Sequence, residues 1–380
     1  MNEQPGQGHS AAKKILVRGV NWLGDAVMST PALQRLREAR ADAEITLLTP
    51  FKLADLWRHH PSVDRLITFA QGENVWKVAA RLRRENFQTA VVFPNSLRSA
   101  LEVWLARVPW RVGYCRSWRN ILLTQPLPPR AGAVKMRKRS TSEINARISQ
   151  GTSAAAYPIS AHHIYDYLNL VSALGAKPEP LTPALHVTAN EVEEVEAAFT
   201  SGIRNKLGDI GLRKPSVWCG LNAGAEFGPA KRWPKENFVA AAKEISRVTD
   251  CLWLIFGGPK DFWLGNEIAR GIGGGVKNLA GKTSLRELML LLKSCRVLLT
   301  NDTGPMHVAA ALGTPVVVPF GSTSPELTGP GSRGETRNAL LSAHVPCSPC
   351  FRRECPIDFR CMRNISIEEV VEAVLRMLRR

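Results

Sequence analysis

The sequence places side chains capable of chemistry in short turns between an apolar run and a helix-like segment. The turn NDTGP holds Asp302, Thr303 and Gly304 between the runs RVLLT and PVVVPF. In parallel α/β sheets, ligands bind beyond the carboxyl ends of strands, where the next helix offers free backbone N–H groups. Asp302 and Thr303 supply oxygens, and Gly304 lets a ligand approach the backbone. A helix N-cap would explain the same residues, so both interpretations stay open.

Two further turns repeat this arrangement. Asp25 lies at the head of the helix that follows the run KILVRGV, where it is either an N-cap or a general base. In AEFGPAKRWPKENF, Lys231 follows another strand-like run and either pairs with a phosphate or stays solvated. His307, one turn beyond Gly304, is either a buried histidine or a ligand contact.

Other motifs exclude some classes of enzyme and leave one question open. GGGVKNLAGKTS has Val276 where a P-loop needs glycine, and no G-x-G-x-x-G follows the first strand. A P-loop ATPase and a nicotinamide dehydrogenase are therefore disfavoured. Short cysteine spacing near the end can close a zinc or iron–sulfur site, but reduced thiols in a structural loop fit as well. These cysteines, Cys347, Cys350, Cys355 and Cys361, are spaced C-x2-C-x4-C-x5-C.

The charge of the chain indicates an acidic partner. Its 380 residues carry a formal net charge of +17. Residues 101–150 contribute +8 of it, from ten Arg or Lys and two Glu. Basic residues among tryptophans suit an anionic membrane surface or a nucleic-acid backbone, and a solvated basic loop is the remaining alternative. The region interleaves Trp104, Trp110 and Trp118 with Arg111, Arg116 and Arg119.

Short apolar runs alternate with amphipathic segments from residue 13, and the alternation restarts after the proline-rich stretch 175–184. This pattern predicts two α/β domains with parallel sheets and a boundary near residue 180. The segment 365–380 is an amphipathic helix without an evident partner. With no long apolar run and no secretory signal at its start, the chain is expected to be cytosolic and its cysteines reduced.

The motifs GDAVMSTPAL, KRWPKENF and NDTGPMHVAAALGTP, with CSPCFRRECP and the final helix, resemble the ADP-heptose:lipopolysaccharide heptosyltransferases of glycosyltransferase family 9. The resemblance covers nearly the whole chain and is strongest to heptosyltransferase II. It implies an α/β GT-B fold, in which two Rossmann-like domains face each other across a cleft. Residues 1–180 would bind the acceptor and 181–364 the nucleotide sugar, with the helix 365–380 packing on the N-terminal domain.

The resemblance also implies the reaction. An inverting glycosyltransferase would move L-glycero-D-manno-heptose from ADP-heptose to the lipopolysaccharide inner core, as the second heptose on heptosyl-Kdo2-lipid A. It would need no cofactor and no metal, bind no nucleic acid, and work at the cytoplasmic face of the inner membrane. Alternatives are heptosyltransferase I, another sugar transferase of the family, and a basic nucleic-acid-binding protein without catalysis.

Residue roles follow from matching positions. Asp25 would be the general base, and Lys231 would stabilise the departing diphosphate. Glu226 and Phe227 stand where family members have a threonine pair, so the contact there must differ or use the backbone. The surface for the acceptor or the membrane would be Arg111, Arg116 and Arg119. The remaining donor contacts would be Asp261, Thr283, Asp302, Thr303, Gly304 and His307.

Overall fold

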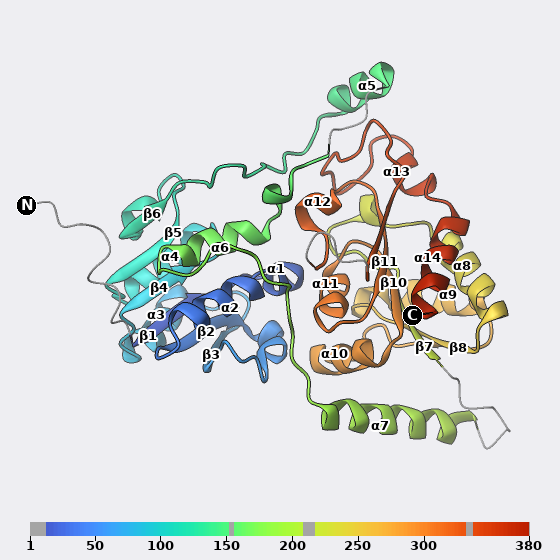
Figure 1. Cartoon of the computed structure of the whole chain (residues 1–380), viewed down its shortest axis with the longest axis horizontal. Helices are drawn as coiled ribbons and strands as arrows, with labels where there is room; N and C mark the ends of the chain where they lie inside the picture. Colours follow the sequence, from blue (N-terminus) through green and yellow to red (C-terminus); the bar gives the residue numbers. More distant parts are fainter. Residues whose placement is uncertain (1–12, 152–155, 208–216, 332–336, 380) are drawn as a thin grey trace, which may run out of the picture. The chain divides into compact units, whose positions relative to one another are not determined.

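The chain forms two compact units, each built around its own sheet (Figure 1). The computed structural model describes residues 13–151, 156–207, 217–331 and 337–379. The described part of the first unit is 13–133 with 160–186, and that of the second is 134–151, 156–159, 187–207, 217–331 and 337–379. The expected boundary near residue 180 lies close to the change of unit after His186, but a segment before it belongs to the second unit.

The first unit contains a parallel six-stranded sheet in the order β3-β2-β1-β4-β5-β6. The chain moves outward from β1 to β3 and then returns to the other side of β1 with β4. The loops after β1 and β4 therefore diverge, which creates the crevice where doubly wound sheets bind ligands. The strands are β1 (Lys14–Arg18), β2 (Glu44–Pro50), β3 (Arg65–Phe69), β4 (Thr89–Val92), β5 (Trp110–Tyr114) and β6 (Gln125–Leu127).

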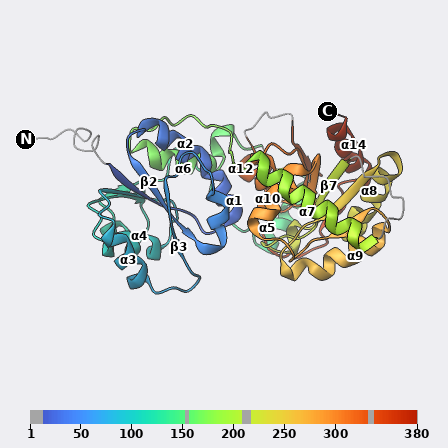
Figure 2. The ribbon, with the colours of Figure 1, turned by 90° about the horizontal axis from the view of Figure 1, so that it is seen from below.

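Helices cover both faces of this sheet. In Figure 2, α2 and α6 lie on one side of the strands, and α3 and α4 lie on the other. The helical stretch after β1 is divided at Ser29, just before Pro31, whose missing N–H suits a helix start. A 3-10 helix, η1 (Phe51–Trp57), follows β2. The α-helices are α1 (Leu23–Met28), α2 (Thr30–Ala39), α3 (Val75–Arg84), α4 (Leu97–Leu105) and α6 (Ile164–Ser172).

The second unit repeats this design with the sheet order β12-β11-β10-β7-β8-β9, again parallel. The chain moves from β7 to β9 on one side and then crosses to β10 on the other. The two parallel sheets confirm the prediction of two α/β domains. The strands are β7 (Val217–Asn222), β8 (Cys251–Ile255), β9 (Val276–Asn278), β10 (Val297–Thr300), β11 (Val316–Phe320) and β12 (Ala339–Ser342).

In the second unit, helices α8, α9 and α10 follow strands β7, β8 and β9 in turn. Ser284 caps α10 in a capping box with Glu287, which satisfies backbone N–H groups at the helix start. Within the described residues, no helix is both long and apolar enough to cross a membrane. The α-helices are α5 (Thr141–Gln150), α7 (Ala189–Leu207), α8 (Lys235–Val248), α9 (Phe262–Ile272), α10 (Leu285–Ser294), α11 (Gly304–Ala311), α12 (Pro325–Thr328), α13 (Arg360–Arg363) and α14 (Ile367–Leu378).

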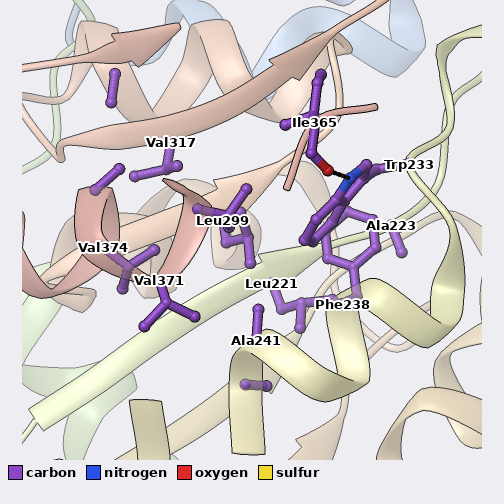
Figure 3. Close-up of a cluster of buried hydrophobic side chains, with 14 of the residues drawn as sticks. Leu221, Ala223, Trp233, Phe238, Ala241, Leu299, Val317, Ile365, Val371 and Val374 are labelled. Atoms are coloured by element: carbon purple, nitrogen blue, oxygen red, sulfur yellow. Dashed lines mark hydrogen bonds between the residues drawn. The ribbon is translucent and has the colours of Figure 1, made fainter. Parts of the chain in front are cut away.

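The last helix packs within the second unit, which corrects the expectation that it crosses back to the N-terminal domain. Val371 and Val374 of α14 join Leu221 and Leu299 of the central strands in one buried cluster (Figure 3). Val370 and Val374 are fully buried there. Because the second sheet buries the apolar face of α14, that face is not available for another domain.

A segment that precedes residue 180 also belongs to the second unit. The backbone N–H of Arg139 donates to the carbonyl of Cys350 at 3.0 Å, and Arg147 Nε donates to the carbonyl of Pro346 at 2.9 Å. Ile144 of α5 is 1% exposed in the core cluster of this unit. The proline-rich stretch marks only the last change from the first unit to the second. The earlier change, at 134–159, depends on contacts between residues that are distant in the sequence, so no local pattern marks it.

Candidate functional site

Two turns of the second unit are joined where the order in which the chain adds strands to the sheet reverses, between β7 and β10. β7 and β10 are neighbours, and the turns that follow them lead to opposite sides of the sheet. Asn301, fully buried, donates through Nδ2 to the carbonyl of Ala223 at 2.8 Å and accepts from the N–H of Trp233 at 3.0 Å. One side chain therefore fixes the turn after β10 to the turn after β7.

Lys231 and Asp302 form an ion pair across these two turns. Lys231 Nζ donates to Asp302 Oδ2 at 2.6 Å, and Thr323 Oγ1 donates to the same oxygen at 2.5 Å. The side chains of Lys231 and Asp302 are 13% and 4% exposed, so their charges compensate each other in a partly dry setting. An ammonium has three N–H donors, and one is used on Asp302. The pair holds a cation where a parallel sheet receives an anionic ligand.

The turn from Thr303 to His307 begins α11. Thr303 occupies the N-cap position, but its side chain makes no capping hydrogen bond. Thr303 is therefore the N-cap residue by position, but its hydroxyl does not cap the helix. Gly304 is the first residue of α11 and is half-buried. His307 is 6% exposed, so it lies on the buried side of this helix rather than on the open side of the turn.

Phe227 replaces one threonine of the expected pair and meets two cations. Lys231 Nζ lies 4.9 Å from the centre of its ring, and the guanidinium carbon of Arg353 lies 5.6 Å from it. Glu226 beside it is exposed. The side chain of Phe227 therefore contributes to holding Lys231, a role that the resemblance does not predict.

Asp261 and Thr283 lie in the turns after β8 and β9. Asp261 Oδ2 accepts from the N–H of Gly258 at 3.0 Å, and a Cβ added to Gly224 would meet the same oxygen at 2.6 Å. The carboxylate is thus packed against the turn after β7. Thr283 is half-buried immediately before Ser284, the cap of α10. Both expected donor contacts lie at the carboxyl edge of the sheet.

Asp25 occupies the corresponding crossover of the first unit. It is the third residue of α1, and Trp22 is the N-cap, so Asp25 is not the capping residue. The side chain is half-buried. Burial, and then the nearby negative charges of Asp25 and Asp166, raise the pKa of the Tyr167 hydroxyl well above its ordinary value. Asp25 therefore lies near the buried Tyr167, in the first turn of a helix whose dipole favours the carboxylate.

A buried ion pair that the sequence interpretation missed holds the turn before Asp25. Arg18, 1% exposed, donates through Nε to Glu102 Oε2 at 2.9 Å. Its Nη1 donates to the carbonyl of Gly19 at 2.5 Å and to Asn21 Oδ1 at 2.9 Å. The signal was present, since Arg18 follows three apolar residues, 15–17, of a strand that should be covered on both faces.

The three arginines expected to form one surface lie in different environments, which corrects that prediction. Arg116 is exposed, whereas Arg111 donates to the carbonyls of Leu122 at 2.7 Å and Val108 at 2.5 Å. Arg119 is 1% exposed, and its Nη1 donates to Asn95 Oδ1 at 3.2 Å. Among the described residues, no hydrogen-bond partner meets its buried Nε and Nη2. Burial, followed by the charge of Arg116, lowers the pKa of Arg119 to about 10.

The four late cysteines surround one small cavity that borders the turns after β7 and β11. Its volume is about 10 Å³, and Ala230 and Ser322 also line it, each next to a residue of the Lys231–Asp302–Thr323 cluster. In the part of the chain that the structure describes, no group of three or more His, Cys, Asp or Glu side chains is arranged to hold a metal ion. Through this cavity the cysteine segment borders the turns that carry Lys231 and Thr323. Its cavity is lined by Cys347, Cys350, Cys355 and Cys361.

A larger hollow of about 380 Å³ lies beside the same turn. Ala223, Arg232 and Trp233 line it together with Leu264 and Met362. Neither Lys231 nor Asp302 contributes to its lining, so this hollow is not the place where the turns after β7 and β10 meet.

Comparison with known proteins identifies the family. Residues 128–359 match glycosyltransferase family 9 (heptosyltransferase). Lipopolysaccharide heptosyltransferase 2 of Salmonella typhimurium is 30% identical, with coverage of 83% of this chain and 85% of the relative. The structure of Escherichia coli ADP-heptose lipopolysaccharide heptosyltransferase II has a TM-score of 0.73 at 26% identity, covering 96% and 98% of the two chains. Lipopolysaccharide heptosyltransferase 1 of Pseudomonas aeruginosa is 21% identical, covering 90% of this chain and 87% of the relative. The chain therefore has the GT-B fold class and belongs to glycosyltransferase family 9, the heptosyltransferase family.

Proposed function

We propose that this glycosyltransferase moves L-glycero-D-manno-heptose from ADP-heptose to heptosyl-Kdo2-lipid A, as the second heptose of the inner core. The observation that carries the proposal is the Lys231–Asp302 pair at the crossover of the second sheet. A preorganised cation at that position suits a leaving diphosphate. The greater identity to relatives named heptosyltransferase 2 than to one named heptosyltransferase 1 supports the choice of acceptor.

The proposed reaction is a single displacement at the anomeric carbon. The acceptor hydroxyl oxygen forms a bond to that carbon while the bond to the diphosphate oxygen breaks, which inverts the configuration. Asp25 accepts the hydroxyl proton, since it is a half-buried carboxylate in the turn that follows β1, at the crossover of the first sheet. The products are the extended acceptor and ADP.

Negative charge grows on the leaving diphosphate during this step. The N–H donors of Lys231 that Asp302 does not use, together with backbone amides at the start of α11, are proposed to stabilise it. Asp261 and Thr283 would contact the nucleotide or the sugar from the neighbouring turns. Nothing in this displacement requires a cofactor, because ADP-heptose is a substrate.

The acceptor is anchored in a membrane, so we also propose peripheral contact with the cytoplasmic leaflet of the inner membrane. The segment Cys115–Leu122 supports this, because Trp118 and Ile121 are 84% and 80% exposed beside the exposed Arg116. An indole and an aliphatic side chain next to a basic group suit the interface of an anionic bilayer. Trp118 adopts a left-handed backbone with φ of 63°, which is uncommon for a bulky residue.

The test is ADP release from ADP-heptose by the purified full chain, with lipid A precursors that carry either no heptose or one heptose. Release with the one-heptose acceptor alone is expected. Release with the heptose-free acceptor would instead assign heptosyltransferase I. If a folded protein releases ADP with neither acceptor, the proposed donor or acceptor is wrong.

A further inference from the structure

We propose that Arg353 is a positioning residue that holds Lys231 in place through Phe227. The inference rests on the proposed role of Lys231 at the leaving diphosphate. Arg353 belongs to the cysteine-containing segment and lies 126 positions from Phe227 in the turn after β7, and the family resemblance assigns it no role. Four separate observations tie it to that turn.

The first two observations concern the backbone. The carbonyl of Arg353 accepts from the N–H of Ala230 at 3.0 Å, directly before Lys231. A Cβ added to Gly228 would lie 2.4 Å from the same carbonyl oxygen, so only glycine allows this approach. Gly228 also has a φ of 149°, which favours glycine. The turn is thus shaped around the backbone of Arg353.

The other two observations concern the side chain. Arg353 Nε donates to the carbonyl of Phe227 at 2.5 Å. Its guanidinium carbon lies 5.6 Å from the centre of the Phe227 ring, within the range of a cation–π contact. The guanidinium therefore holds both the backbone and the ring of one residue, which fixes the direction of the ring.

The ring of Phe227 makes a cation–π contact with Lys231. Lys231 Nζ lies 4.9 Å from the ring centre and donates to Asp302 Oδ2 at 2.6 Å. Two contacts thus set the ammonium position, and one of them depends on the ring that Arg353 orients. Phe227 and Arg353 thus act together on the position of Lys231.

The segment around Arg353 also supports the other partner of Asp302. The N–H of Phe351 donates to the carbonyl of Ser322 at 2.7 Å, and Ser348 Oγ donates to the carbonyl of Gly321 at 2.5 Å. These carbonyls directly precede Thr323, which donates to Asp302. One short segment therefore contacts both the turn after β11, which carries Thr323, and the turn after β7, which carries Lys231. Arg353 is its contact with the Lys231 turn.

The position of Arg353 makes the proposal testable, because the residue is exposed and lies outside the buried core. Its replacement by alanine leaves the backbone contact with Ala230 intact. For Arg353→Ala we expect kcat/KM for ADP-heptose to fall about tenfold, mainly through kcat, since one hydrogen bond and one cation–π contact are lost. Arg352→Ala is the matched control, as its Nη1 donates instead to the carbonyl of Arg139 at 3.0 Å.

Two further variants separate positioning from direct contact with the diphosphate. Phe227→Leu removes the ring and should reproduce the tenfold loss, and the double variant should lose no more than either single one. If Arg353 touched the diphosphate itself, Phe227→Leu would be mild, the losses would multiply and Arg353→Lys would restore activity. Additive losses or an unaffected Arg353→Ala would overturn the proposal.

A final readout does not depend on the proposed reaction. In the absence of substrate, labelling of Lys231 by an amine-acylating reagent, followed by mass spectrometry, reports how firmly its ammonium is held. Labelling should rise severalfold in Arg353→Ala and not in Arg352→Ala. Unchanged labelling would contradict positioning, whatever the substrate of the enzyme is, whereas raised labelling without heptosyl transfer would fault the proposed function alone.

Discussion

The two units hold their cations differently at the same edge of similar sheets. In the second unit, Lys231 is paired with Asp302 at 2.6 Å. In the first, Arg119 is more deeply buried, donates to the neutral side chain of Asn95, and has no partner for Nε and Nη2 among the described residues. Asn95 follows β4, so Arg119 lies at the carboxyl edge of the sheet, the edge where Asp25 follows β1.

The buried cation of the second unit is already compensated by a carboxylate. The buried guanidinium of Arg119 has no such partner among the described residues, so it is suited to bind an anion. Pairing Lys231 with Asp302 fixes a cation in the absence of a ligand, which is what the proposed stabilisation of a leaving group needs. An unpaired buried guanidinium is costly, and an anion of the acceptor would compensate it. The first unit does pair a buried cation elsewhere, since Arg18 meets Glu102 at 2.9 Å. Among the described residues, Arg119 therefore differs from Arg18 in having no carboxylate as a hydrogen-bond partner.

The largest expected effect concerns the base. Asp25→Asn keeps the size of the side chain but removes proton acceptance, so kcat should fall by roughly 1,000-fold. ADP release with the one-heptose acceptor measures it, with the melting temperature as a check of folding. Asp55→Asn, in the exposed part of η1, is the control and should keep full activity. A loss smaller than tenfold would remove Asp25 from the role of base.

The next effect tests the paired cation. Lys231→Met should lower kcat by roughly 100-fold and also lower the free energy of unfolding, because Asp302 is left buried without its counter-charge. Adding Asp302→Asn should recover the stability and not the rate. Lys235→Met removes a surface ion pair with Glu267 and should change neither. Stability that does not recover would mean that the pair is not compensating charge as proposed.

Sequence patterns predicted the two sheets and the turns that carry Asp25, Lys231 and Asp302, because strand periodicity and turn chemistry are local. They did not predict that Thr323 joins Asp302 or that Arg353 joins Phe227. Those pairs connect residues that are distant in the chain, and neither has a local signature. The final helix was assigned to the wrong unit for the same reason, since an amphipathic pattern shows that a face is buried but not against what.

A smaller effect tests the unpaired cation. Arg119→Met should raise KM for the acceptor roughly tenfold, as a charged hydrogen bond to an anion is lost, and leave KM for ADP-heptose unchanged. In contrast to Lys231→Met, it should not lower the melting temperature, because it removes a buried charge that has no counter-charge within the described ranges of the chain. Arg107→Met, at an exposed neighbouring position, is the control. A destabilised Arg119→Met would show that the guanidinium is already compensated, and the comparison of the two units would fail.

The smallest expected effect concerns the membrane. Trp118→Ala should weaken binding of the full chain to vesicles containing anionic phospholipid by about fivefold, since insertion of one indole contributes a modest apolar area. Ile121→Ala should add to the loss, whereas Trp76→Ala, equally an exposed indole at 65%, should not. Co-sedimentation at several salt concentrations measures both contributions. If all three variants bind alike, the contact is carried by charge, and raising the salt concentration should then release wild type and variants together.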